Sequence, residues 1–427
     1  MSGAFNGAQA VLKKDFPAAK YQHCANHRLD LCLQELAREE RLVREVLELV
    51  RQIAFFIRES GKRLQLYKAT CEEIAASVED GSLEFTQLTA LCPTRWVIRV
   101  KGISSIIRNY KPLVRLLHQI SCDRSYTADA RTKASGFLRQ LTKFETIVGM
   151  HISLSVFEPS ESLATKLQSQ ENSIGSAHQA IVLLKRHMQK LRSDETFAEI
   201  FGKADSFREA NDLSPPKESR TKRLPKWVDD HAENAFQHSS FSDKCRIEYF
   251  QLIDRIIQAL DNRFDDKFLE ACDDVESALI RACSNQFSAV EMKAEHFEGV
   301  DGEVFSRELQ MLPTLAKQGN IPGSFGEFVC MLRNCHPTCL PFFPEVIKVT
   351  KLLLTFPVSV ASAERSFSTL RRLKTWLRNT MGQKRLTALA VCNIHKRYVD
   401  NLDVNDLCDN FIRKTNERRK VFSEKHL

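Results

Sequence analysis

The chain has 427 residues and a net charge of +8, with 43% hydrophobic residues and only 15 Gly and 13 Pro. This length allows a large core in two or three structural units, and the composition argues against long disorder or a β-rich fold full of tight turns. No run of about 18 apolar residues and no secretory signal is visible, so neither a membrane span nor export is expected. Thirteen scattered cysteines are typical of reduced, intracellular thiols.

The N-terminal part is expected to be helical apart from one short strand. A first helix is predicted over Ser2–Phe16, where a proline follows. Tyr21–His23 is long enough for one strand, which we predict to be the only one, or nearly so, in this part. Apolar residues at three- and four-residue spacing predict helices over 26–38 and 41–57, and a softer region follows at 70–87.

Two groups of cysteine and histidine raise the question of a metal. Cys24 and His27 form a C-x-x-H pair before the second helix, which is half of a structural zinc site. The alternative interpretation is a buried thiol and a histidine at a helix start. Three cysteines and a histidine within 330–339 match no common zinc finger, and one helix turn does not point all four at one ion. We therefore expect no metal and no cofactor.

A tryptophan among cations marks the next junction. Trp96 follows a proline-marked turn, is flanked by Arg95, Arg99 and Lys101, and precedes a predicted helix over 98–107. Such a tryptophan stacks on a nucleic-acid base in some proteins, whereas most aromatic residues near helix starts belong to the core. The residues alone leave both interpretations open.

The middle of the chain is predicted to be a helical bundle with one break. Apolar residues at helical spacing indicate about four helices between 110 and 201. The pattern breaks at 206–227, a linker with two adjacent prolines whose cations include Arg220, Lys222 and Arg223. These cations either contact phosphates, form a nuclear-localisation patch or are simply solvated. Further helices are predicted over 242–264, 267–287 and 345–355, with a less regular stretch at 295–344.

The stretch Pro357–His395 is predicted to form two helices joined by a short turn. Thr380, with Gln383 three residues later, resembles a capping box for the second helix. Two adjacent apolar helices need a cover, either the body of the protein or a second copy. One carboxylate, Glu364, lies in the first turn. The apolar residues at helical spacing are Phe367, Leu370, Leu373, Trp376 and Leu377 in the first helix and Leu386, Leu389 and Ile394 in the second.

Four motifs stand in a fixed order along the chain: Met1–Gly7, Tyr21–Leu29, Cys92–Trp96 and Ser362–Ser368. In this order they resemble the hAT-superfamily transposases and their domesticated vertebrate-type relatives, including zinc-finger MYM-type proteins. The stretch 362–378 is similar to the hAT C-terminal dimerisation region. The motifs together span almost the whole chain.

The resemblance implies a catalytic history for a few residues. In that family a ribonuclease-H-like sheet is interrupted by a helical insertion, and two Asp and one Glu hold divalent metals for phosphodiester cleavage. Glu364 matches that Glu, Trp96 matches a Trp beside the scissile end, and Cys24 and His27 match a pair near the active site. Neither Asp has a counterpart in this sequence, so we expect no DNA cleavage and regard the four residues as vestigial.

The resemblance also implies an architecture and two alternative functions. The expected fold is mainly α: a remnant of the ribonuclease-H-like core at 1–96, a helical insertion at 97–345, and a dimerisation region with a basic tail at 346–427. The leading interpretation is a catalytically inactive, transposase-like protein that forms a homodimer or pairs with a related hAT-type protein. The runner-up is a non-catalytic DNA-binding or chromatin-associated protein that uses its basic patches. The resemblance and the basic clusters predict that the protein resides in the nucleus, with the cytoplasm as the alternative.

Overall fold

The chain is helical in two compact units. The computed structural model describes residues 7–17, 19, 21, 23–76, 87–91, 97–168, 173–216, 240–264, 267–287, 297–316, 321–356, 358–359, 361–375 and 380–422, with the backbone alone for 361–365. Within these ranges there is no strand, so the mainly-α prediction is confirmed. The units are Met1–Ser359 and Val360–Leu427. None of the described helices is both long enough and apolar enough to cross a membrane.

The first unit contains α1 (Ala8–Asp15), α2 (Ala25–Glu39), α3 (Arg41–Arg58), α4 (Gly61–Ala76), α5 (Arg99–Arg108), α6 (Tyr110–Cys122), α7 (Ala128–Leu141), α8 (Phe144–Leu167), α9 (Ile174–Leu191), α10 (Asp194–Ala210), α11 (Phe241–Phe264), α12 (Lys267–Cys283), α13 (Gly302–Leu315), α14 (Phe325–Asn334), the 3-10 helix η1 (Leu340–Phe342) and α15 (Pro344–Thr355). The second unit contains α16 (Ala361–Leu373), α17 (Gln383–Ile394), α18 (Lys396–Asp400), α19 (Val404–Arg413) and α20 (Asn416–Phe422).

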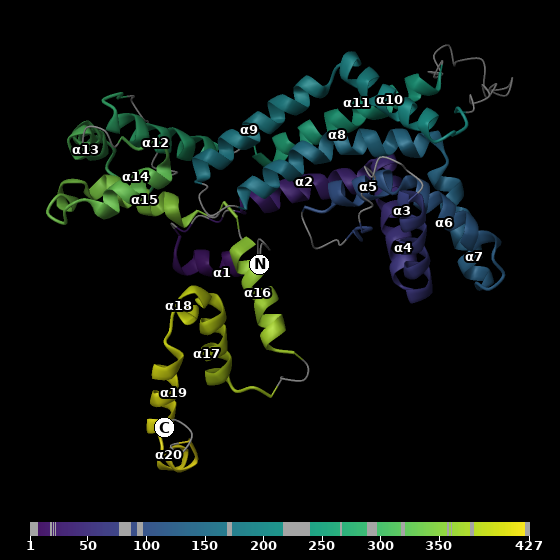
Figure 1. Cartoon of the computed structure of the whole chain (residues 1–427). Helices are drawn as coiled ribbons and strands as arrows, with labels where there is room; N and C mark the ends of the chain where they lie inside the picture. The colour runs from purple at the N-terminus through teal and green to yellow at the C-terminus, as the bar shows by residue number, and fades with distance from the viewer. Residues whose placement is uncertain are drawn as a thin grey trace. The chain divides into compact units, whose positions relative to one another are not determined.

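Helix α8 forms the centre of the first unit. Its apolar residues, among them Ile147, Ile152 and Phe157, are fully buried on several sides of the helix. A helix that is apolar on most sides needs to be enclosed by others. Helices α2, α3, α5, α7, α9, α10 and α11 all contact it (Figure 1). One continuous hydrophobic core then runs from α2 to α15, so the first two predicted regions share a core.

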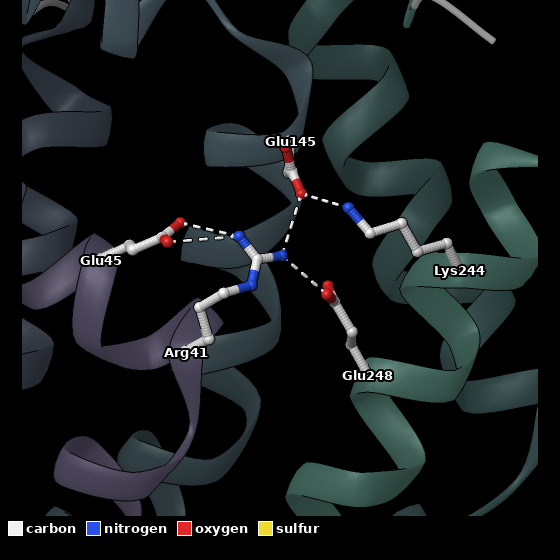
Figure 2. Close-up of polar contacts among 5 residues, drawn as sticks. All are labelled: Arg41, Glu45, Glu145, Lys244 and Glu248. Atoms are coloured by element: carbon white, nitrogen blue, oxygen red, sulfur yellow. Dashed lines mark hydrogen bonds and ion pairs between the residues drawn. The ribbon is translucent and has the colours of Figure 1, made fainter. Parts of the chain in front are cut away.

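A charged cluster holds the ends of three helices together beside this core. Arg41 at the start of α3 contacts Glu45 at 3.1 Å, Glu145 of α8 at 3.3 Å and Glu248 of α11 at 2.8 Å (Figure 2). Lys244 lies 2.7 Å from Glu145. The hydrogen bond that Arg41 donates to Glu248 is the largest cause of the raised pKa of Arg41. Because these side chains are partly exposed, we assign the cluster an orienting role and only a modest stabilising one.

The predicted strand is wrong. Tyr21 and His23 adopt no regular secondary structure, and no strand lies beside them in the described part of the chain. A strand without a neighbour leaves its backbone N–H and C=O groups unpaired, which makes it unstable. The ribonuclease-H-like remnant is therefore not seen in the described residues and stays a prediction.

Most predicted helices begin and end within one or two residues of those observed, but α4 was not predicted and runs to Ala76, inside the expected softer region 70–87. Three further details need correction. The stretch 110–201 holds the starts of five helices, α6 to α10, where about four were predicted. The predicted linker starts too early, because α10 continues to Ala210 while the ring of Phe207 packs edge-on against Tyr110 at 5.0 Å. The stretch 295–344 contains α13, α14 and η1. Residues 217–239 lie outside the described residues.

Candidate functional site

The second unit exposes apolar side chains and has no buried core among its described residues. None of its described side chains is buried, whereas the first unit encloses a continuous core. Phe367 is 69% exposed, Ile394 63% and Tyr398 76%. Exposed apolar surface of this density is typical of an interaction site, because each such side chain gains free energy when it leaves water.

Helices α16 and α17 contact each other and bring together the predicted dimerisation residues. Phe367 and Leu370 are exposed on α16, and Val391 is exposed with Ile394 on α17. The side chains of Leu373, Leu386 and Leu389 are half-buried. Trp376 and Leu377 lie outside the described residues. The remaining predicted residues thus lie on two adjacent helices, with part of their apolar surface open.

The predicted capping box at the start of α17 is wrong. The helix begins at Gln383, and its N-cap is Gly382, which makes no side-chain cap. Glycine is tolerated at the N-cap because the first N–H groups of the helix can then donate to water or to another hydrogen-bond acceptor. Thr380 lies two residues outside the N-cap, in a turn.

The net charge of the chain is concentrated in the same segment. Residues 361–399 contain nine Lys or Arg against the single acid Glu364, a net +8 that equals the net charge of the whole chain. The cations are Arg365, Arg371, Arg372, Lys374, Arg378, Lys384, Arg385, Lys396 and Arg397. Two copies of such a segment repel each other, so contact between them has to run through the apolar side chains.

Helix α19 carries a second apolar face, which the sequence analysis missed. Val404, Leu407 and Phe411 are 68%, 49% and 49% exposed and follow one another at three- and four-residue spacing. This spacing places them on one side of a helix, and the same signal was visible in the sequence. The side chain of Asp403 accepts the N–H groups of Asn405 at 2.7 Å and Asp406 at 3.4 Å, which fixes the start of the helix.

The four residues regarded as vestigial are only partly described. Glu364 belongs to α16 by its backbone, and Trp96 lies outside the described residues. Cys24 is buried and is the N-cap of α2, where its Sγ accepts the N–H of His27 at 3.3 Å. This geometry agrees with a structural thiol at a helix start. In the described residues, no group of three or more Cys, His, Asp or Glu is placed to hold a metal ion.

Of the six cations predicted to contact nucleic acid, the structure describes two: Arg99, which is buried, and Lys101, which is exposed. Arg99 is buried, with its Nη2 3.0 Å from Asp30 of α2 and its Nη1 4.0 Å from Glu161 of α8. Glu161 also accepts the N–H groups of Ile98, Arg99 and Val100 at 3.2, 2.8 and 3.3 Å, which caps α5. Burial raises the pKa of Glu161, while these N–H groups oppose the rise. Arg99 thus joins three helices inside the protein.

Lys101 is exposed on α5, two residues after the buried arginine. Arg95, Arg220, Lys222 and Arg223 lie outside the described residues. The described residues therefore give no common surface for the predicted phosphate contacts. The described cations are concentrated on α16, α17 and α18, and again at the end of α19 and on α20.

Comparison with known proteins identifies the C-terminal region. Residues 340–398 match the family model of the hAT family C-terminal dimerisation region, which here covers η1, α15, α16, α17 and the start of α18. Over 424 residues the chain is 22% identical to the 52 kDa repressor of the inhibitor of the protein kinase from Homo sapiens. That alignment covers 95% of this chain and 52% of the relative, so the chain spans about half the length of the relative. The resemblance predicted from the four motifs is confirmed.

Proposed function

We propose that this transposase-derived chain, which carries a hAT C-terminal dimerisation region, self-associates through the exposed apolar side chains of α16 and α17. The observation that carries the proposal is the absence of any buried side chain among the described residues of Val360–Leu427, in a chain whose first unit has an extensive core. The apolar surface of these helices becomes covered when a second copy brings its own.

The apolar side chains set the strength of this contact. Phe367, Leu370, Val391 and Ile394 are 69%, 37%, 50% and 63% exposed. Full burial of one such side chain is worth about 1.5–3 kcal/mol, so covering the exposed fractions yields about 3–7 kcal/mol per copy, or about 7–13 kcal/mol per dimer. Association itself costs about 4–15 kcal/mol. These four side chains therefore support at most a weak dimer without further contacts.

A double substitution tests the assignment. Phe367→Asp with Leu370→Asp places two carboxylates in the contact, and we expect the mass in solution to fall from dimer to monomer. Ser368→Asp with Thr369→Asp is the matched control, because it adds the same charge to the same helix outside the apolar set. A wild-type chain that is monomeric at micromolar concentration would contradict the proposal, and so would an unchanged mass in the apolar double variant.

The proposal also holds that this chain does not cleave DNA. Of the family's three catalytic carboxylates, the resemblance matches only one in this chain, Glu364. Paired divalent ions need several anionic ligands. Incubation of the purified chain with supercoiled plasmid and Mg²⁺ or Mn²⁺ tests this. Nicking that is present in the wild type and lost in Glu364→Gln would refute it. Nuclear residence is part of the same proposal and is tested by imaging a fluorescent fusion.

A second candidate function is phosphate-driven binding of nucleic acid. It is favoured by the concentration of the whole net charge in 361–399. Binding through phosphates releases counterions and weakens steeply as salt rises. A gel shift at low salt, compared with one at physiological salt and with the variant Arg371→Gln and Arg372→Gln, tests it. No complex at low salt rejects this function and leaves self-association unaffected.

A further inference from the structure

We propose that α19 and α20 pair with the same two helices of a second copy in antiparallel orientation. The inference rests on the proposed self-association and adds a contact outside the matched region 340–398. A second copy then covers the apolar side of α19, and residues 400–422 determine how the two chains are oriented.

The apolar side of α19 is the first observation. Val404, Leu407 and Phe411 form a continuous exposed stripe on this helix. Helix α20 folds back onto the C-terminal part of α19, where the rings of Phe411 and Phe422 lie 6.0 Å apart in an edge-on arrangement and the guanidinium of Arg418 lies 4.1 Å from the Phe411 ring. The two helices thus form a hairpin, and the stripe stays open along it.

The charges of the hairpin are the second observation, because they separate along its length. Residues 400–409 contain four carboxylates and no Lys or Arg, namely Asp400, Asp403, Asp406 and Asp409. Residues 410–422 contain five cations, Arg413, Lys414, Arg418, Arg419 and Lys420, and one acid, Glu417. One end therefore has a net charge of −4 and the other a net charge of +4.

This separation selects both the partner and the orientation. A two-fold axis places the same surface of two copies face to face, and antiparallel helices bring the acidic end of each copy against the basic end of the other. Parallel pairing would place like charges together. The helix dipole also favours aspartates at the start of α19 and Arg413 at its end, but it accounts neither for the cations of α20 nor for the open apolar stripe.

The need for more contact area points to the same occupant. The apolar side chains of α16 and α17 support only a weak dimer, and residues 361–399 repel their counterpart because both carry +8. Helix α17 contacts α18, and α19 begins four residues after α18 ends, so the hairpin follows the matched region directly in the sequence. The hairpin supplies both apolar surface and attraction between unlike charges, whereas the matched region lacks this attraction.

A native thiol reports on this pairing. Cys408 is half-buried beside the stripe, and it lies with Leu407 midway between Val404 and Phe411. When two stripes pair antiparallel and in register, the two-fold axis passes near this midpoint and brings the Cys408 thiols of both chains together. A short bismaleimide added to the full chain, followed by peptide mass spectrometry, should then link Cys408 to Cys408. The exposed Cys392 of α17 serves as the comparison thiol in the same sample.

Substitutions separate this contact from the one through α16 and α17. Val404→Asp with Leu407→Asp should weaken dimerisation of the full chain about tenfold or more, because the charged side chains replace the buried stripe. Asn405→Asp, on the polar side of the same helix, is the matched control and should leave the dissociation constant within about twofold. Helical content by circular dichroism confirms that each variant remains folded.

Charge reversal tests the orientation. Asp400→Lys with Asp406→Lys brings the net charge of residues 400–409 to 0, and Lys414→Glu with Lys420→Glu brings that of residues 410–422 to 0, so each variant keeps one charged end. Each variant alone should dimerise more weakly than the wild type, and an equimolar mixture should recover association as a mixed dimer. Parallel pairing predicts instead that each variant alone dimerises more tightly than the wild type, because it removes the like-charge repulsion at one end.

The outcomes are distinguishable. If Phe367→Asp with Leu370→Asp weakens dimerisation, Val404→Asp with Leu407→Asp does not, and no Cys408–Cys408 link forms, this inference is overturned and the proposed function stands. A dimer with the opposite sensitivities supports the inference and overturns the proposed role of α16. A monomeric wild type rejects both.

Discussion

The buried Arg99 allows a quantitative prediction that separates its two interpretations. The substitution Arg99→Met keeps an unbranched apolar stem in α5 but removes the guanidinium between Asp30 and Glu161. These carboxylates are 3% and 4% exposed, and the arginine side chain is 11% exposed, so none of the three charges is well solvated. The variant leaves at least one buried carboxylate without its cation.

The magnitude follows from this geometry. Breaking a buried ion pair by removing one partner costs about 3–5 kcal/mol, because the remaining charge stays buried. Glu161 keeps three backbone N–H donors and is partly compensated, whereas Asp30 keeps the amide of Gln34 at 2.5 Å. We therefore expect a loss near the lower limit, about 3 kcal/mol of unfolding free energy. Adding Asp30→Asn to Arg99→Met should recover part of it, since the uncompensated charge is then removed.

The assay is chemical denaturation of the full chain followed by circular dichroism, with the midpoint as the readout. Lys101→Met is the matched control on the same helix, and because Lys101 is exposed its effect should stay within about 0.5 kcal/mol. A gel shift on both variants completes the comparison. If Arg99→Met unfolds at the wild-type denaturant concentration but loses nucleic-acid binding, Arg99 is a surface ligand and the structural role is refuted.

Two further predictions concern the contact between α9 and α12. Gly175→Ala should destabilise the protein by about 1–3 kcal/mol in thermal unfolding, because a Cβ there would lie 2.5 Å from Oε2 of Glu276. Gly202→Ala on α10 is the control: no atom lies within 4 Å of its Cβ, so this variant should gain up to about 1 kcal/mol of stability. Equal effects of the two substitutions would contradict the tight packing at Gly175. Burial raises the pKa of Glu276 to about 7 against the hydrogen bond from Ser173, so its contribution to stability is largest below pH about 4.5 and is lost as the pH rises through about 7. Glu276→Gln should accordingly gain stability over the wild type across this interval, up to about 3 kcal/mol, and a pH-independent difference would show that the carboxylate does not titrate there.

The sequence was informative where the signal is local. Apolar residues at helical spacing, such as Val46, Val50 and Ile53 in α3, predicted helix positions closely, because burying one stripe of a helix needs only the correct period. The exposed face of α16 was predicted for the same reason. Four motifs in order were sufficient to predict the hAT resemblance.

The details that were missed depend on partners distant in the chain. Arg99 was expected at the surface, but Asp30 is 69 residues away and Glu161 62 residues away in the sequence, and no local pattern joins them. The Tyr21–His23 strand was predicted from its length and from the ribonuclease-H-like core that the resemblance implies, and a strand also needs a neighbour. The stripe on α19 has the same local signal of three- and four-residue spacing, but it lies C-terminal to the four motifs that carry the hAT resemblance.

The central claim is that this chain self-associates through its C-terminal unit, and its mass in solution tests this most directly. Sedimentation equilibrium or light scattering on the full chain at micromolar concentration should give twice the chain mass of 48.9 kDa. The same measurement on Phe367→Asp with Leu370→Asp should return toward 48.9 kDa. A wild-type mass of one chain across this concentration range would contradict the account.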